Sequence, residues 1–389
     1  MNRRRSFATQ DESERAFLVG VDSKAPANGR SIADSLGELC YLAQTAGATV
    51  VGTLTQKLTS PSARYYLGKG KLKELVELKA QKQYSLVIFG GELSPQQQRN
   101  LEEALQTKVI DRTALILDIF AKHAQTREGQ LQVELAQHQY LLPRLAGQWS
   151  HLEQLGGGIG TRGPGESQLE TDRRLIRGRI QHLRNKINQV KRHRALYRQQ
   201  RKKGGVPTVA LVGYTNSGKS TLLNALSKAN VLVEDKLFST LDPVTRRIIL
   251  PDNQRFLLTD TVGFIHKLPV SIVAAFRATL EELEEADLLL HIVDITHPNA
   301  AEQCQTVEKI LADLTLNETP KITVFNKLDL ILESEAELKA LSTISYSEKQ
   351  INLSEAPMVL ISASRRWGMS ELLNKIATHL SLKRVDSRT

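Results

Sequence analysis

The sequence predicts an α/β fold in which two regions of alternating strands and helices lie on either side of a helical hairpin. Short β-rich runs alternate with helical patterns up to about residue 120, and the same alternation begins again at residue 208. Between these regions, apolar residues recur every three or four positions, which is the period of one helix face. Because strands that alternate with helices form mainly parallel sheets, we expect one such sheet in each α/β region.

The first region, residues 1–120, is expected to be a small N-terminal α/β domain. Its predicted strands cover residues 17–21, 49–52, 86–89 and 108–110, and its predicted helices cover residues 31–46, 69–82 and 94–105. The last of these helices has the clearest start, because Ser94 can cap it and Pro95 suits its first turn.

The second region, residues 121–205, predicts the helical hairpin. The first apolar stripe consists of Leu131, Leu135, His138, Leu142 and Leu145, and the second consists of Ile176, Ile180, Leu183, Ile187, Val190, Arg194 and Tyr197. Six glycines within residues 156–165 separate the stripes and predict a flexible tip. We therefore expect the stripes to face each other and the basic residues of the second helix to point outward.

The positive charge of the chain is concentrated in the second helix of this hairpin. The chain has a net charge of +10, whereas residues 171–203 alone hold thirteen lysines and arginines against one aspartate. This segment therefore carries +12 and the remainder of the chain −2. Such a concentration favours a polyanionic partner, nucleic acid before a membrane, although a merely solvated helix face stays an alternative.

Composition excludes several other classes of protein. Apolar residues make up 41% and charged residues 24% of the chain, which excludes a disordered or collagen-like chain. No run approaches the roughly 18 apolar residues that a membrane span requires, and no apolar signal core follows the basic start. We therefore expect a cytoplasmic protein without a membrane span.

Residues 206–382 are expected to form a P-loop (Ras-like) domain, because they open with a phosphate-binding motif. The pattern G-x-x-x-x-G-K-S is met by Gly213, Tyr214, Thr215, Asn216, Ser217, Gly218, Lys219 and Ser220. A predicted strand, residues 208–212, precedes this motif and a predicted helix, residues 221–227, follows it, as the motif requires. Lys219 would then reach the β- and γ-phosphates of a nucleotide, and the Ser220 hydroxyl would ligate Mg²⁺.

Two later motifs favour guanine over adenine. Asn326, Lys327, Leu328 and Asp329 follow a predicted strand at residues 322–325, and Ser362, Ala363 and Ser364 follow another at residues 358–361. A carboxylate at Asp329 can accept two hydrogen bonds from the N1–H and N2–H₂ edge of guanine, which adenine does not offer. The second motif resembles the base loop of GTPases. Together the motifs predict a site for GTP and GDP.

Two candidate switches lie between the phosphate motif and the base motifs. The D-x-x-G motif consists of Asp260, Thr261, Val262 and Gly263, and the earlier segment consists of Phe238, Ser239, Thr240, Leu241 and Asp242. Asp260 would hold Mg²⁺ through water, and the Gly263 amide would sense the γ-phosphate. Thr240 would complete the Mg²⁺ shell, although Ser239 and Thr245 also offer hydroxyls. The predicted catalytic residues are Lys219, Thr240 and Gly263.

The residue after Gly263 is Phe264, where many GTPases have a glutamine that orients the attacking water. A phenyl ring can neither donate a hydrogen bond to this water nor accept one from it. We therefore expect the site to bind GTP well but to hydrolyse it slowly alone, with faster hydrolysis once a partner docks.

Three segments carry a resemblance to a known family. They are the glycine-rich string at residues 156–170, the FSTLDP segment at 238–243 and the YYLGKGK segment at 65–71. In these segments, and over nearly its whole length, the chain resembles the HflX family of ribosome-associated GTPases. The resemblance implies an N-terminal α/β domain, a helical hairpin and a G domain, followed here by a short polar tail at residues 383–389.

The resemblance also implies a function. It predicts a monomeric enzyme that hydrolyses GTP to GDP and phosphate with Mg²⁺, is stimulated by the ribosome, and binds the large ribosomal subunit and its rRNA. In the GTP-bound state it would dissociate stalled or idle ribosomes under stress. The alternative is an RNA-binding or RNA-remodelling NTPase whose GTP site is regulatory and whose target is not the ribosome.

Overall fold

The computed structural model describes residues 14–23, 32–145, 164–203, 205–227, 237–238, 240–266, 283–343 and 357–386. Three predicted features fall outside these ranges: the glycine-rich tip up to residue 163, Ser239, and residues 387–389 of the tail. The chain divides into two compact units, one of residues 1–119 and 139–177 and the other of residues 120–138 and 178–389. Helices α4 (Arg112–His123), α5 (Arg127–Leu141) and α8 (Pro164–Lys203) pass from one unit into the other.

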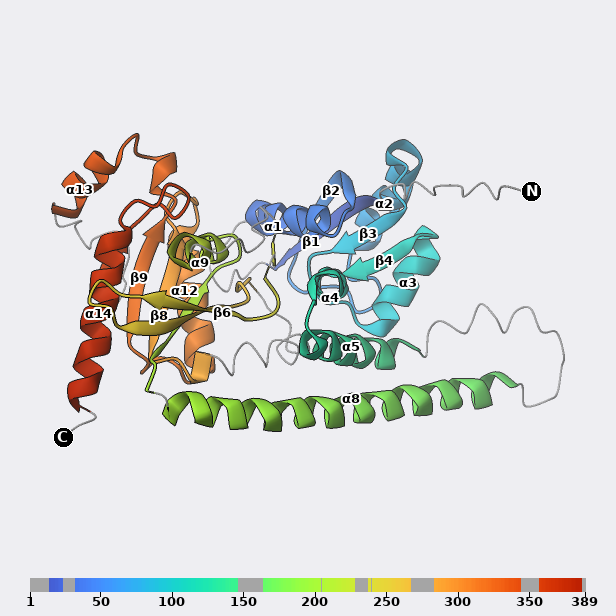
Figure 1. Ribbon diagram of the computed structural model, residues 1–389. Coiled ribbons are helices and arrows are strands. Elements are labelled where there is room, and N and C mark those ends of the chain that lie inside the picture. Colours follow the sequence, from blue (N-terminus) through green and yellow to red (C-terminus); the bar gives the residue numbers. More distant parts are fainter. Residues whose placement is uncertain are drawn as a thin grey trace, which may run out of the picture. The chain divides into compact units, whose positions relative to one another are not determined.

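The first unit contains a four-stranded parallel sheet. Its strands lie in the order β2 (Thr49–Leu58), β1 (Arg15–Ser23), β3 (Leu86–Phe89) and β4 (Lys108–Asp111). Its helices include α1 (Ile32–Thr45), α2 (Lys69–Lys82) and α3 (Pro95–Leu105) (Figure 1). The parallel sheet, the four predicted strands and the three predicted helices of this region are thereby confirmed.

Two helix starts in the first unit, those of α3 and α4, follow from local capping. Ser94 Oγ accepts a hydrogen bond from the Gln97 N–H (3.2 Å), and Gln97 Oε1 accepts one from the Ser94 N–H (2.9 Å), so α3 begins where the sequence predicts. Helix α4 was not predicted, because it follows β4 without a loop. Asp111, the last residue of that strand, accepts a hydrogen bond from the Ala114 N–H (2.9 Å) and so acts as the cap.

Within the second unit, the parts of α5 and α8 that belong to it lie side by side and antiparallel (Figure 1). A short 3₁₀ helix, η1 (Leu142–Arg144), follows α5. Ile180, Leu183 and Ile187 of the predicted stripe on α8 are buried, as is Leu135 on α5. The second helix of the predicted hairpin therefore turns its apolar stripe inward along this stretch.

Two arginines of α8 depart from the outward direction expected for its basic residues. The Arg179 guanidinium pairs with Glu134 Oε1 (2.6 Å), and that of Arg194 pairs with Glu128 Oε1 (3.1 Å) on α5. Charge counting along one helix does not reveal such pairs, because the carboxylates lie 45 and 66 residues away on another helix. The exposed positive charge of α8 is correspondingly smaller than the sequence suggests.

The rest of the second unit is built on a six-stranded sheet. Its strands lie in the order β10 (Met358–Leu360), β9 (Lys321–Asn326), β8 (Leu288–Asp294), β5 (Thr208–Gly213), β7 (Arg255–Asp260) and β6 (Val244–Ile249). All neighbours are parallel except β6 and β7, so the predicted mainly parallel sheet is confirmed. Its helices include α9 (Lys219–Ser227), α12 (Ala300–Asp313), α13 (Glu335–Thr343) and α14 (Met369–Asp386).

Helices cover both faces of this sheet. Leu222 and Leu223 of α9 and Leu372 of α14 belong to one buried apolar cluster with strand residues such as Phe256. On the other face, Val307 of α12 is buried with Ala210, Val212 and Leu289. The sheet is thus held rigidly between two apolar layers, which fixes the positions of the loops at its carboxyl edge. Among the described helices, none is long and apolar enough to cross a membrane.

Candidate nucleotide site

The phosphate loop connects the carboxyl end of β5 to α9. Strand β5 is the first strand of this domain in the sequence, and in the sheet it lies between β7 and β8. Later strands were therefore added on both sides of β5. In such sheets a ligand crevice is expected at the carboxyl end of the strand where the order reverses. Gly218 has a φ of 96°, and a Cβ there would run into the side-chain amide of Asn326. Glycine therefore lets the loop lie directly against the strand that carries the base motif.

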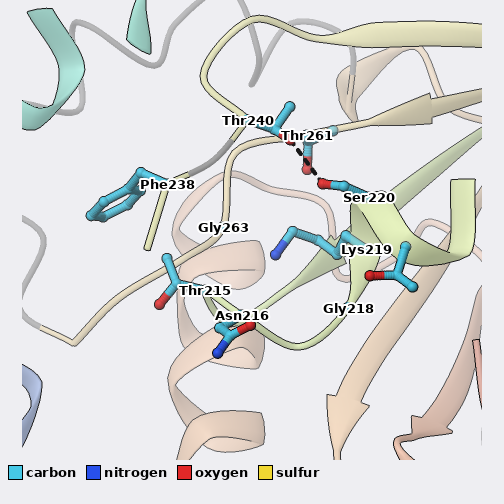
Figure 2. Close-up of a pocket in the computed structure, with 10 residues that line it drawn as sticks. Thr215, Asn216, Gly218, Lys219, Ser220, Phe238, Thr240, Thr261 and Gly263 are labelled. Atoms are coloured by element: carbon cyan, nitrogen blue, oxygen red, sulfur yellow. Dashed lines mark hydrogen bonds between the residues drawn. The ribbon is translucent and has the colours of Figure 1, made fainter. Parts of the chain in front are cut away.

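The phosphate loop holds buried polar groups that suit an anion. Thr215 Oγ1 and Ser217 Oγ are buried without a hydrogen-bond partner among the described residues. The Lys219 ammonium is buried, points toward Gly263 and Thr215 (Figure 2), and donates to the Tyr214 carbonyl (2.7 Å). Burial lowers the pKa of Lys219 to about 8, although the Asp260 carboxylate raises it. A phosphate would supply the negative charge and the acceptors that these groups require.

Three oxygen ligands converge beside the loop, where Mg²⁺ is expected. Ser220 Oγ lies 2.8 Å from Thr240 Oγ1 (Figure 2). Asp260 Oδ2 lies 2.6 Å from Ser220 Oγ and 3.0 Å from Thr240 Oγ1. Asp260 Oδ1 is buried and has no hydrogen-bond partner among the described residues. Burial raises the pKa of Asp260, while Lys219 and the two hydroxyls lower it. Mg²⁺ prefers oxygen ligands of this kind, so the residues fit the cation.

The described residues separate two of the hydroxyls that the sequence left open. Thr240 Oγ1 faces Ser220, whereas Thr245 Oγ1 lies 2.9 Å from Thr259 Oγ1 across the β6–β7 pair. Ser239 lies outside the described residues. Of these two threonines, Thr240 is the one that we expect to ligate the metal, because its hydroxyl faces Ser220 and Asp260.

The base end of the site consists of two loops held together by hydrogen bonds. Asn326 Nδ2 donates to the Ser217 carbonyl (2.9 Å) and its Oδ1 accepts from the Ala363 N–H (3.0 Å), so one side chain ties the phosphate loop to the base loop. Ser362 Oγ and Ser364 Oγ donate to the two oxygens of Asp329 (2.6 and 2.9 Å). Burial alone would raise the pKa of Asp329. The hydrogen bonds from the two serines outweigh this effect, so the pKa lies below its usual value. The carboxylate therefore stays ionised as an acceptor for guanine.

The remaining predicted residues support these contacts. Lys327 has a φ of 68° and its ammonium pairs with Asp294 Oδ2 (2.8 Å), an ion pair that the sequence did not predict. Thr261 Oγ1 donates to the Leu211 carbonyl (2.5 Å) and fixes the start of the D-x-x-G loop. Tyr214, Leu241, Val262 and Leu328 are buried, and Asn216 lines the pocket with a φ of 61°.

Gly263 lies against the phosphate loop, whereas the Phe264 side chain is buried among apolar residues. A Cβ on Gly263 would lie 2.7 Å from Thr215 Cα and 2.9 Å from Lys219 Nζ, so only glycine allows this approach to the phosphate loop. The next residue, Phe264, is bonded through its backbone to Gly213 and Thr215, and its ring is buried in an apolar cluster. No polar side chain is therefore available from position 264 to orient a water.

Two residues of the earlier switch segment have partners that the sequence did not predict. The Phe238 ring points away from Lys219 and Ser220 (Figure 2) and packs on Phe120. The Asp242 carboxylate accepts hydrogen bonds from Gln125 and Thr126. These partners lie more than 110 residues earlier in the chain, and no local pattern in either segment indicates the contact.

Comparison with known proteins agrees with this geometry. Residues 208–327 match a family described as 50S ribosome-binding GTPase, residues 33–121 match the N-terminal region of a GTP-binding GTPase family, and residues 123–201 match the middle region of such a family. Together these models cover more than half of the chain.

Curated relatives agree over most of the sequence. The GTPase HflX of Caldanaerobacter subterraneus subsp. tengcongensis is 54% identical over 82% of this chain and 74% of its own length. The GTPase HflX of Lacrimispora saccharolytica is 47% identical over 96% and 84%, and that of Escherichia coli K12 is 45% identical over 85% and 76%.

Proposed function

Because the chain belongs to the HflX family of GTPases and hydrolyses GTP, we propose that it binds the large ribosomal subunit in its GTP-bound state and dissociates stalled or idle ribosomes. The observation that carries this proposal is that a helix with a row of exposed arginines leads directly into the domain that holds the guanine-nucleotide site. Helix α8 ends at Lys203 and the strand that leads into the phosphate loop begins at Thr208. A description of the matched G-domain family as 50S ribosome-binding supports the same partner.

The arginines that would contact rRNA lie on one side of α8. Arg174, Arg177, Arg184 and Arg192 are exposed, and no described carboxylate pairs with them. They follow one another at spacings of three, seven and eight residues, close to whole turns of a helix. The positive charges of such a row can neutralise successive phosphates. Folded RNA is commonly recognised in this way, through its shape and backbone and not through its base sequence.

The nucleotide would act as the signal for this binding. Thr240 lies beside Ser220, and Gly263 lies beside Lys219. A γ-phosphate and Mg²⁺ bound to Lys219 and Ser220 would therefore contact both residues. GTP would therefore order both switches, and hydrolysis to GDP would release them. Mg²⁺ would be held by Ser220 and Thr240, with Asp260 behind them, and would supply charge stabilisation to the transferring phosphoryl group.

Hydrolysis would be slow until the ribosome docks, because Phe264 is buried and offers no polar group to the attacking water. Unassisted GTPases turn over on the order of 10⁻³–10⁻² s⁻¹, and we expect a similar rate here, rising at least tenfold with large subunits. The protein would act as a cytoplasmic monomer, with stress as the condition that supplies its targets.

Sedimentation through a sucrose gradient tests the partner. The protein with a non-hydrolysable GTP analogue should migrate with large subunits, and far less of it should do so with GDP. Ribosome dissociation, followed by light scattering, should require the same analogue. Migration with small subunits only, or with neither subunit, would contradict the proposal, and binding to unrelated structured RNA instead would favour an RNA-remodelling NTPase.

A charge variant tests the surface. Replacing Arg177, Arg184 and Arg192 with glutamine should weaken binding to large subunits and flatten its salt dependence by about 0.7–0.9 log unit per lost phosphate contact. The matched control is Arg179→Gln, which removes an arginine that already pairs with Glu134. A triple variant whose salt dependence equals that of the parent would show that this helix face does not contact RNA.

A further inference from the structure

The segment from Phe238 to Asp242 brings Thr240 to the oxygens that would hold Mg²⁺. Phe238 and Asp242 lie two residues before and two residues after Thr240. Both make contacts with one further element, the α4–α5 corner, which we define as residues 120–130. This corner lies outside all the nucleotide motifs but belongs to the same compact unit as the G domain.

The first contact is aromatic. The Phe238 side chain is 1% exposed, and its ring meets that of Phe120 edge to face, with centroids 4.8 Å apart and planes at 87°. The backbone of Phe238 has a φ of 58°, a left-handed conformation that is unfavourable for a bulky residue. Burial of the ring against α4 offsets that strain and so holds the backbone at Phe238.

The second contact is a set of hydrogen bonds at the start of α5. Asp242 Oδ2 accepts from the backbone N–H groups of Gln125 (2.8 Å) and Thr126 (2.7 Å), and Oδ1 accepts from Thr126 Oγ1 (2.5 Å). Thr126 Oγ1 also accepts from the Gly129 N–H (3.0 Å), so Thr126 caps α5. A carboxylate at this end of a helix gains from the helix dipole as well as from the hydrogen bonds.

The space for the carboxylate depends on Gly129. A Cβ added there would collide with Asp242 Oδ1 and lie 3.2 Å from Asp242 Cγ. Gly129 lies in the first turn of α5 and has an ordinary helical backbone, so the helix itself does not require glycine at this position. The same Cβ would lie 3.3 Å from Thr126 Oγ1, so the glycine leaves room both for the Asp242 carboxylate and for the hydroxyl that binds it.

We propose that Phe238 and Asp242 are positioning residues for GTP hydrolysis, which hold Thr240 at the Mg²⁺ site by docking on the α4–α5 corner. Fixing a loop costs conformational entropy, and the two contacts restrict the segment on both sides of Thr240 before any partner binds. The corner thus acts as an internal support of the switch. This inference concerns the isolated GTPase and does not depend on the proposed ribosomal function.

The test uses Gly129→Ala in the full-length protein. Alanine favours a helix more than glycine does, so α5 should be retained while Asp242 is displaced. We expect single-turnover GTP hydrolysis to slow by about five- to tenfold, the range expected when a cap contact of this kind is lost. Affinity for GDP without Mg²⁺ should stay within about twofold, because Asp242 makes its hydrogen bonds to the corner. The matched control is Gly178→Ala on α8, where a Cβ would meet nothing within 4 Å.

A double-mutant cycle and an exchange measurement separate positioning from a merely structural role. Asp242→Ala alone should slow hydrolysis to a similar extent, and adding Gly129→Ala to it should change the rate less than about twofold, because the displaced carboxylate is already gone. Amide hydrogen exchange of the peptide that contains Thr240 should be faster in Gly129→Ala than in the parent or in Gly178→Ala.

Two outcomes would overturn the proposal: additive losses of rate in the double variant, or unchanged exchange around Thr240 in Gly129→Ala. If Asp242→Ala fails to fold, Gly129→Ala still decides the matter through its exchange and its rate.

Discussion

The two ends of the nucleotide site are constructed differently. At the base end, the described hydrogen bonds of the Asn326 and Asp329 side chains go to loops at the carboxyl edge of one sheet, namely to Ser217, Ala363 and the serines at 362 and 364. At the switch end, Phe238 and Asp242 contact the α4–α5 corner, which comes before the G domain in the chain. We therefore expect base selection to depend on the G domain, whereas we propose that the placement of Thr240 depends on another part of the chain.

The difference follows from what each end has to do. A base pocket must keep one geometry in both nucleotide states, and a rigid sheet that is packed on both faces supplies it. A switch must change with the γ-phosphate, so it needs a second surface on which one of its conformations is stabilised. Variants that affect one end and leave the other unchanged can test this division.

The largest effect is expected from Asp329→Asn at the base end. Loss of a charge-assisted acceptor should weaken GTP binding by about 2–3 kcal/mol, while xanthine, which matches an amide, should bind better than before. Exchange around Thr240 should not change. Competition between GTP and XTP, measured by fluorescence, checks this, and a variant that still prefers GTP as strongly as the parent would show that Asp329 does not read the base.

The complementary change is Phe238→Ala at the switch end. It removes an aromatic pair worth about 1 kcal/mol beyond its buried area, so single-turnover hydrolysis should slow by roughly fivefold to tenfold. The preference for GTP over XTP should equal that of the parent, because the ring does not contact the base loops. A change in that preference would show that the two ends are coupled and would refute the division.

A smaller effect is expected from Ser364→Ala, which removes one of the two serine hydrogen bonds to Asp329. Guanine affinity should fall by about 1 kcal/mol, the net worth of an ordinary hydrogen bond. The pKa of Asp329 should rise, because this hydrogen bond lowers it. Binding requires the ionised carboxylate, so on acidification the affinity should begin to fall at a higher pH than in the parent. Titrations at a series of pH values test this, with Ser381→Ala on α14 as the control.

The smallest effect on the site itself is expected from Arg184→Gln on α8. Neither GTP affinity nor hydrolysis without ribosomes should change, because this exposed arginine touches neither end of the site. For binding to large subunits, the slope of log affinity against log salt concentration should become shallower by about 0.7–0.9. This change corresponds to the loss of one phosphate contact. Arg179→Gln has the same change of net charge and should change this slope less, since Glu134 already pairs with that arginine. If Arg184→Gln and Arg179→Gln changed the salt dependence equally, the position of an arginine on the helix would have no effect on binding to the subunit.

The sequence by itself determined the features whose cause is local. The phosphate loop, the D-x-x-G motif and the base motifs could be placed because each consists of neighbouring residues that directly follow a predicted strand. The parallel sheets and the start of α3 at Ser94 were predictable for the same reason, since alternation and capping act over a few residues. Helix α4 was missed because it has no loop before it to mark its start.

Only the tertiary structure decided which distant groups meet. The partners of Arg179 and Arg194 on α5, the choice between Thr240 and Thr245, and the docking of Asp242 beside Gly129 each join segments that are far apart or depend on the pairing of strands. Aspartate, glycine and phenylalanine occur in many local settings, and their spacing in the chain does not specify a remote partner. Such contacts arise when packed helices and sheets bring the segments together, so the switch support follows from the fold and not from any motif.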